Sequence, residues 1–270
     1  MLFDAQGVMT EQFDQALEAF GRGDCATALG LWGALAEQGN AASQYNLGFM
    51  YASGQGVARD DARALGWYHR AADQGFADAK FQLGSMYAGG RGAARDVAKA
   101  HGWYRAAAEQ GHTRSQYALA IMYDHGQGVA KDEARAASWY RKAAEQGFAA
   151  AQYNLGVMYA SGQGVAKDEA QAAAWYHRAA EQGLAEAQSN LGVAYATGRG
   201  VPKDEAKAWL WLRKAGDQGL ADAQFNIGLA YAQGRGVPKD EEQAAAWYRA
   251  AAAQGNVAAQ MCLEALQRRK

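Results

Sequence analysis

The sequence predicts an all-α solenoid of six 36-residue helix–turn–helix repeats with partial repeats at both ends. Three observations support this fold class. Glycine recurs with a fixed period, each period carries two stretches of apolar residues at helical spacing, and 33 glycines accompany only two prolines. Regular glycines with almost no proline are typical of helices that end at short turns.

A recurring Gln-Gly pair defines the repeat. Its glycine falls every 36 residues, at Gly39, Gly75, Gly111, Gly147, Gly183, Gly219 and Gly255. We assign six repeats to residues 40–75, 76–111, 112–147, 148–183, 184–219 and 220–255, an N-terminal degenerate repeat to 1–39 and a C-terminal capping helix to 256–270. Repeats of this length bury their apolar faces by stacking on their neighbours.

The first helix of a repeat is clearest in residues 148–183. Gln152, Leu155, Gly156 and Tyr159 stand at i, i+3, i+4 and i+7, which predicts one buried helical face. Gly156 lies on that face, so we expect a neighbouring helix to approach closely there. Gly162 is expected to end the helix in the left-handed conformation.

The second helix is predicted to begin at Asp168, a residue type that caps helix N-termini, and Asp recurs at this position in all six repeats. Ala172, Trp175 and Tyr176 then start a broad apolar face, and Gln182-Gly183 closes the helix. We expect the Trp-Tyr pair to lie in the core, so replacing Trp139 with Ala should lower the free energy of unfolding by about 3–5 kcal/mol.

The two ends carry shorter versions of the same pattern. Residues 10–20 place Phe13, Ala16, Leu17 and Phe20 on one face, and residues 24–39 carry Leu31-Trp32 where other repeats have Trp-Tyr. A final helix is expected over 257–267, followed by Arg268, Arg269 and Lys270, whose charges suit a helix C-terminus. Such atypical ends cap the exposed faces of a solenoid.

These residues resemble the Sel-one-like repeat, a relative of the tetratricopeptide repeat. The resemblance rests on the pattern Q-Y-N-L-G-x-M-Y-A-S-G-Q-G-V-A-K-D-E followed by W-Y-x-x-A-A-E-Q-G, which recurs with substitutions in the six repeats and covers roughly residues 40–267. It implies a right-handed superhelix in which first helices line the concave face. It also implies a non-enzymatic scaffold or adaptor that binds a protein or peptide.

Charge and hydropathy exclude other classes of partner. The 27 Lys and Arg residues nearly balance 28 Asp and Glu residues, so the positive surface that binds nucleic acid or anionic membranes is not expected. No apolar run of about 20 residues predicts a membrane span. As given, the chain is expected to be cytoplasmic, with a periplasmic or secreted location as the alternative if a signal peptide preceded it.

Catalytic and cofactor sites are not expected. Gly-x-Gly segments such as Gly162-Gln163-Gly164 lack the preceding strand and following Lys of a phosphate loop. The histidines form no metal-binding spacing, and we expect His69 and His177 to be solvated residues on helix faces. We therefore predict no enzyme activity, no cofactor and no metal.

The partner is expected to bind the first-helix side opposite Gln152 and Leu155, in an aromatic ladder flanked by amides. The alternative is that these rings are partly buried between successive first helices. Repeat three adds an unusual polar set, which either sets specificity for a charged partner or reflects drift in a tolerant turn; its members are His112, Arg114, Asp124 and His125. The candidate partner-binding residues are Tyr45, Asn46, Phe49, Phe81, Tyr117, Ile121, Asp124, His125, Tyr153, Asn154, Val157, Asn190, Phe225 and Asn226.

Two other functions stay open. A small-molecule or hydrolytic function would use the same groove, and it would require a compact pocket with converging titratable groups. Self-assembly through the terminal helices would make the chain a weak oligomer instead of a monomer.

Overall fold

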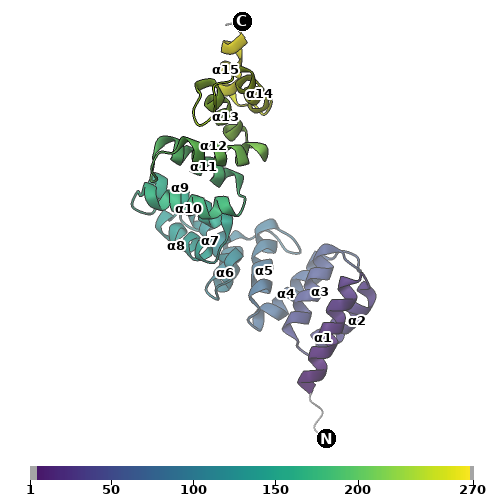
Figure 1. The fold of residues 1–270 in the computed structure, drawn as a ribbon. Helices are drawn as coiled ribbons and strands as arrows, with labels where there is room; N and C mark the ends of the chain where they lie inside the picture. The colour runs from purple at the N-terminus through teal and green to yellow at the C-terminus, as the bar shows by residue number, and fades with distance from the viewer. Residues whose placement is uncertain (1–4, 268–270) are drawn as a thin grey trace. The chain divides into compact units, whose positions relative to one another are not determined.

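Fifteen α-helices joined by short turns make up residues 5–267, the part of the chain that the computed structural model describes (Figure 1). No strand occurs within those residues. The helix-pair fold predicted from the sequence is therefore confirmed. Arg268, Arg269 and Lys270, the expected cations after the last helix, lie outside the described residues.

The helices follow the predicted repeat frame. The first helices of the six repeats are α3 (Ala41–Ser53), α5 (Ala77–Gly89), α7 (Thr113–His125), α9 (Ala149–Ser161), α11 (Ala185–Thr197) and α13 (Ala221–Gln233). The second helices are α4 (Asp61–Asp73), α6 (Val97–Ala108), α8 (Glu133–Glu145), α10 (Glu169–Glu181), α12 (Glu205–Asp217) and α14 (Glu241–Ala253). The ends are α1 (Ala5–Gly21), α2 (Cys25–Glu37) and α15 (Val257–Gln267).

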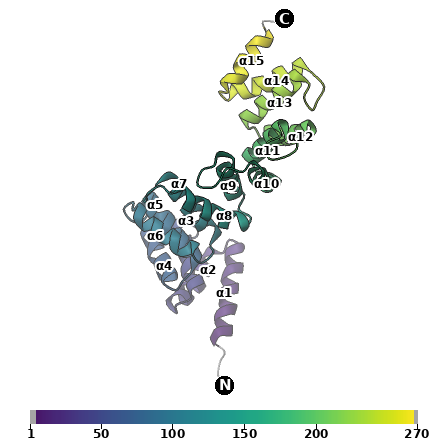
Figure 2. The ribbon, with the colours of Figure 1, turned by 90° about the vertical axis from the view of Figure 1, so that its left-hand side faces the viewer.

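The chain divides into two compact units, Met1–Lys131 with α1 to α7 and Asp132–Lys270 with α8 to α15. Within each unit, every helix packs against the next one along the chain. Both views show this succession of adjacent helices inside each unit (Figures 1 and 2). Each apolar helix face is therefore covered by its sequence neighbours, as expected for stacked repeats.

Both ends of the predicted helices carry the expected caps. The carboxylate of Asp60 accepts a hydrogen bond from the backbone N–H of Arg63 at 2.9 Å, and an Asp caps the second helix of every repeat in the same way. Gly162 ends α9 with φ of 78°, in the left-handed region. These caps satisfy backbone groups that a helix terminus leaves without partners.

Gly156 allows the close helix contact predicted for it. A Cβ atom at this position would lie 2.7 Å from Cε1 of Tyr176, so any larger residue would displace the ring. Gly48, Gly84 and Gly228 meet Tyr68, Tyr104 and Tyr248 in the same way. In these four repeats the first and second helices therefore pack with a tyrosine ring on bare backbone.

In most repeats the large buried residue of the second helix is the tyrosine of the Trp-Tyr pair, although Trp175 of α10 is buried as well and Leu212 takes the place of the tyrosine in α12. Tyr68 is only 1 % exposed, whereas Trp67 is half-buried and carries the Arg70 guanidinium 4.5 Å from its ring. Trp139 is likewise half-buried, with Lys142 Nζ 3.9 Å from its ring. The prediction that Trp139 belongs to the core is wrong, because its ring lies at the edge of the helix face beside solvent.

Buried glutamines connect one repeat to the next. Gln188 Nε2 donates to the carbonyl of Ala180 at the end of the preceding repeat (3.2 Å), and its Oε1 accepts from Nε2 of Gln218 (2.8 Å). Gln218 also donates to the carbonyl of Gly183 (3.0 Å). The same arrangement recurs with Gln224 and Gln254. The glutamine of the Gln-Gly pair is therefore a contact between repeats as well as a helix end.

Candidate functional site

The predicted aromatic ladder is half-buried. The rings of Tyr45 and Tyr68 lie 5.6 Å apart between centroids, and Phe76 of the next repeat lies 5.2 Å from Tyr45. Phe81 packs in the same way on Tyr104 and on the first residue of repeat three. Each ring therefore fills space between its own second helix and the following repeat, which favours the alternative of partly buried rings.

Unit two shows the same packing at the ladder position. Tyr153 lies 6.0 Å from Tyr176, and Phe225 lies 5.9 Å from Tyr248. Burial raises the pKa of Tyr153, and it raises the pKa of Tyr176 to about 12, with a hydrogen bond from Asn190 opposing the shift. Asn190 therefore contacts tyrosines of the preceding repeat.

The remaining ladder and amide residues differ in exposure. Phe49 is the most accessible ring, 37 % exposed, and it lies edge-on to Phe20 at 6.3 Å. The other half-buried members of the predicted set are Asn46, Tyr117, Ile121, Asp124, Asn154, Val157 and Asn226. Their role in binding a partner stays a prediction.

The polar set of repeat three is partly structural. His112 caps α7, since its Nδ1 accepts from the backbone N–H of Ser115 (3.2 Å) and its Nε2 lies 3.3 Å from Asp78 Oδ1. His125 is exposed, with Nδ1 3.1 Å from the carbonyl of Ile121. Of this set, Arg114 and His125 are exposed on α7, whereas His112 and Asp124 are half-buried.

His69 differs from the solvated helix-face residue expected from the sequence. Its Nε2 lies 3.1 Å from the hydroxyl of Tyr87, and its ring meets Trp103 edge-on at 5.4 Å. Burial lowers the pKa of His69, with Asp73 raising it and Lys99 lowering it. The side chain is therefore a contact between repeats. His177 likewise meets Trp211 of the next repeat edge-on at 5.8 Å, and its Nδ1 lies 3.5 Å from Glu181.

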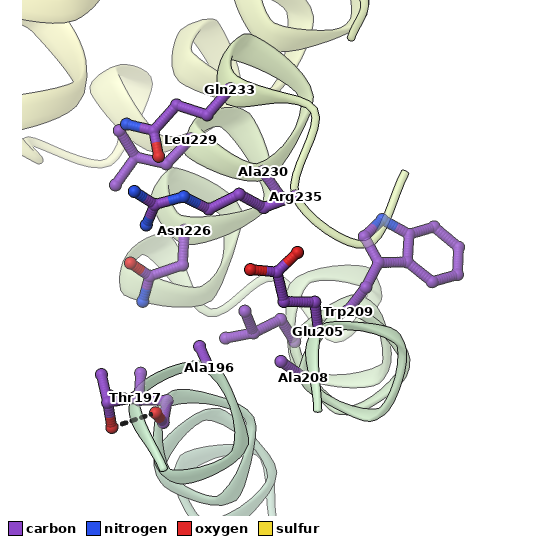
Figure 3. A pocket seen from close by; sticks show the side chains of 12 residues that line it. Ala196, Thr197, Glu205, Ala208, Trp209, Asn226, Leu229, Ala230, Gln233 and Arg235 are labelled. Carbon is purple, nitrogen blue, oxygen red and sulfur yellow. Dashed lines mark hydrogen bonds between the residues drawn. The ribbon is translucent and has the colours of Figure 1, made fainter. Parts of the chain in front are cut away.

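Two pockets open at equivalent repeat junctions, one within each compact unit, and each has a volume of about 220 Å³. Junction pocket 2–3 is lined by Ala88, Arg95, Val97, Tyr104, Ala118, Ile121, Met122 and Gln127. Junction pocket 5–6 is lined by Val193, Ala196, Thr197, Glu205, Ala208, Trp209, Leu212, Asn226, Leu229, Ala230, Gln233 and Arg235 (Figure 3). Both include predicted partner-binding residues, Ile121 in one and Asn226 in the other.

Junction pocket 5–6 extends to Ala208 of α12, whereas junction pocket 2–3 does not extend to the equivalent Ala100 of α6. In repeats two and three, Tyr104 and Met122 pack with Ala100 in one apolar cluster, which closes that space. The equivalent residues around junction pocket 5–6 are Leu212 and Ala230, and there Ala208 lines the pocket. Two smaller side chains therefore open the inner part of this pocket. The signal was present in the sequence, but it appears only when the repeats are compared position by position.

The polar groups of junction pocket 5–6 lie at its edge. Figure 3 shows Asn226 and Arg235 on one side and the Glu205 carboxylate opposite them, while the Trp209 indole points away. Glu205 pairs with Lys203 Nζ at 3.0 Å. The Arg235 guanidinium has no hydrogen-bond or ion-pair partner within residues 5–267. The pocket therefore combines apolar walls with an available cation and an amide.

Within residues 5–267, no group of three His, Cys, Asp or Glu side chains could hold a metal ion. Over the same residues, no helix is long and apolar enough to cross a membrane. Cys25 and Cys262 are both free thiols. A further pocket of about 500 Å³ is lined by Met9, Thr10, Phe13, Asn40 and Ala42. The two junction pockets differ from it because they recur at equivalent positions of the repeats.

Comparisons with known proteins agree with the repeat frame. A family model described as Sel1 repeat matches residues 41–76, 77–112, 113–148, 149–184, 185–220 and 221–256. The search of curated proteins found no relative.

Two solved structures are similar over most of the chain. One is c5321 of Escherichia coli, described as a protective antigen of uropathogenic strains with an SLR fold, with 37 % identity and a TM-score of 0.93. The match covers 98 % of this chain, and this chain spans 58 % of that protein. The other is a Sel1 repeat protein from Oxalobacter formigenes, with 33 % identity, a TM-score of 0.75 and coverage of 89 % and 96 %. The chain belongs to the Sel1-repeat family.

Proposed function

We propose that this chain is a non-enzymatic scaffold that binds a segment of a protein partner on the first-helix face of its repeats. Sel1 repeats commonly mediate protein–protein interaction, and scaffolds of this family are generally non-enzymatic. The observation that carries the proposal is the recurrence of one pocket at equivalent junctions, one in each unit, which supports the same kind of contact with a partner segment in either unit.

Variants of the pocket walls test this proposal. Ile121→Glu and Leu229→Glu place a carboxylate in junction pockets 2–3 and 5–6, respectively. The double variant should lose the proteins that the full-length wild-type chain captures from extract of its native host. Leu210→Glu is the matched control, because Leu210 is 47 % exposed on α12 and does not line a pocket.

Circular dichroism should first show that the wild-type and variant chains have the same helix content. Capture of the same proteins by wild type and the double variant would contradict binding on this face. Failure of the wild-type chain to retain any protein would contradict the scaffold function itself.

Self-association is a second candidate, favoured by the outer face of α15. Val257 is 68 % exposed and Met261 is 67 % exposed, one helical turn apart. If α15 joins two copies, light scattering should give a mass that rises with concentration for wild type and stays monomeric for Val257→Glu/Met261→Glu. A monomeric wild type over the whole range would exclude this candidate.

A further inference from the structure

We propose that junction pocket 5–6 anchors the partner by taking one large apolar side chain that lies next to a carboxylate. The inference rests on the proposed function and specifies the chemistry of the ligand. It depends on the apolar depth of this pocket together with the available guanidinium of Arg235 at its edge.

The inner part of the pocket is suited to an apolar group. Val193, Ala208, Leu212 and Ala230 contribute aliphatic walls, and the volume is about 220 Å³. A cavity of about 150 Å³ lined by aliphatic and aromatic residues is large enough for a benzene ring. One Leu, Met or Phe side chain therefore matches the available space, and its removal from water would provide the main favourable free energy.

The edge of the pocket favours a negative charge. Glu205 lines the pocket, but Lys203 Nζ lies 3.0 Å from its carboxylate and offsets its charge. Arg235 has no such partner within the described chain, so one positive charge remains beside the amide of Asn226. A guanidinium binds a carboxylate through paired hydrogen bonds, which explains the preference for an acidic neighbour on the ligand.

The equivalent pocket of unit one differs in its inner space and at its edge. Gln127 stands at the position of Arg235, and Met122 occupies the position of Ala230. Arg95 brings a positive charge to that pocket, but its Nε donates to the carbonyl of Ala88 at 3.1 Å, which holds one edge of the guanidinium against the backbone. Tyr104 and Met122 fill the inner space there, so the anchor is assigned to junction pocket 5–6.

A small fluorinated probe tests the pocket without knowledge of the partner. The probe is 3-(4-fluorophenyl)propionate, titrated with the full chain and followed by fluorine NMR. The corresponding primary amide and amine keep the ring and change only the charge. We expect the carboxylate to bind about tenfold more tightly than the amide, as a charge-assisted hydrogen bond implies.

Residues borrowed from other repeats provide the variants. Ala230→Met introduces the residue found at Met50, Met86, Met122 and Met158, and it should reduce probe affinity at least about tenfold by filling the inner pocket. Arg235→Gln introduces the residue of Gln55, Gln127 and Gln163, and it should remove the preference for the carboxylate. Ala194→Met makes the same exchange at a position that does not line the pocket, and it should leave affinity unchanged.

Three outcomes would overturn the inference. The first is no binding of the probe by wild type, or equal binding by Ala230→Met. The second is equal affinity for the carboxylate and the amide. The third is tightest binding of the amine, which would make Glu205 the partner of the ligand. The anchor and the scaffold function can also fail separately. If the chain captured a protein, and if Ala230→Met and Arg235→Gln left the affinity for that protein unchanged, the anchor would be wrong and the scaffold function would stand.

Discussion

At the scale of single residues, the buried tyrosine dominates the packing of each helix pair. The apolar face of the second helix contains adjacent Trp and Tyr residues, which point about 100° apart around a helix axis. The spacing of apolar residues allows either one to face the core. The structure distinguishes them, because Tyr68 packs on the backbone of Gly48 while Trp67 lies beside Arg70.

Replacing Tyr68 with Ala should therefore cost about 3–5 kcal/mol, because the ring leaves a cavity that the glycine beside it cannot fill. Replacing Trp67 with Ala should cost about 1–2 kcal/mol, since only part of that ring is removed from water. Urea unfolding followed by circular dichroism measures both. A larger loss for Trp67→Ala than for Tyr68→Ala would reverse the assignment of the core residue.

Two half-buried histidines give the fold a pH dependence. Burial lowers the pKa of His69 and of His101, whose Nε2 lies 3.3 Å from the Tyr123 hydroxyl. For His101, the charge of Arg105 lowers the pKa further. Below the ordinary histidine pKa of 6.5, the unfolded chain then binds more protons than the folded chain. The contribution of these neutral histidines to the free energy of unfolding is therefore fully present above pH 6.5. It is lost as the pH falls through the lowered pKa of the folded state.

The thermal midpoint should consequently decrease between pH 7.5 and pH 5.5. The double variant His69→Arg/His101→Ala introduces the residues that stand at the equivalent positions of repeats three and four, Arg141 and Ala173. The thermal midpoint of this variant should decrease less than that of wild type over the same pH range. An identical decrease in wild type and variant would assign the pH dependence to other groups.

At the scale of helices and their junctions, most of the architecture follows from the repeat. The Asp and Gly caps and the close contact at Gly156 could all be predicted from one repeat, because each depends on local chemistry. The half-buried state of the ladder at Tyr45 and the depth of junction pocket 5–6 could not. Both depend on side chains of neighbouring helices, which a single repeat does not contain.

The glutamine contacts yield a prediction at this scale. Gln188→Leu should destabilise unit two by about 1–3 kcal/mol, because the Ala180 carbonyl and the Gln218 amide both lose a buried partner. In a double-mutant cycle with Gln218→Ala, the two losses should be less than additive. Strict additivity of the unfolding free energies would show that the two amides act independently.

At the scale of the whole molecule, stability should be local because within each unit every helix packs on its sequence neighbours. Cys262, Leu263 and Leu266 of α15 pack on the cluster around Ala244 and Tyr248. This last helix is therefore expected to protect the end of unit two and to contribute nothing directly to unit one.

Deletion of residues 257–270 tests this expectation by hydrogen exchange with mass spectrometry. Amide exchange should become faster in α13 and α14, because the apolar cluster loses one wall. It should stay unchanged in α1 to α6. Faster exchange throughout the chain would mean that the two units unfold as one cooperative body.

The repeated glutamine contacts also affect how such a chain can diversify. Because successive junctions use the same donor and acceptor positions, removal or duplication of one complete 36-residue block rejoins matching surfaces. Copy number can then change during evolution without new interfacial chemistry, so the length of such a protein is free to evolve in whole-block increments.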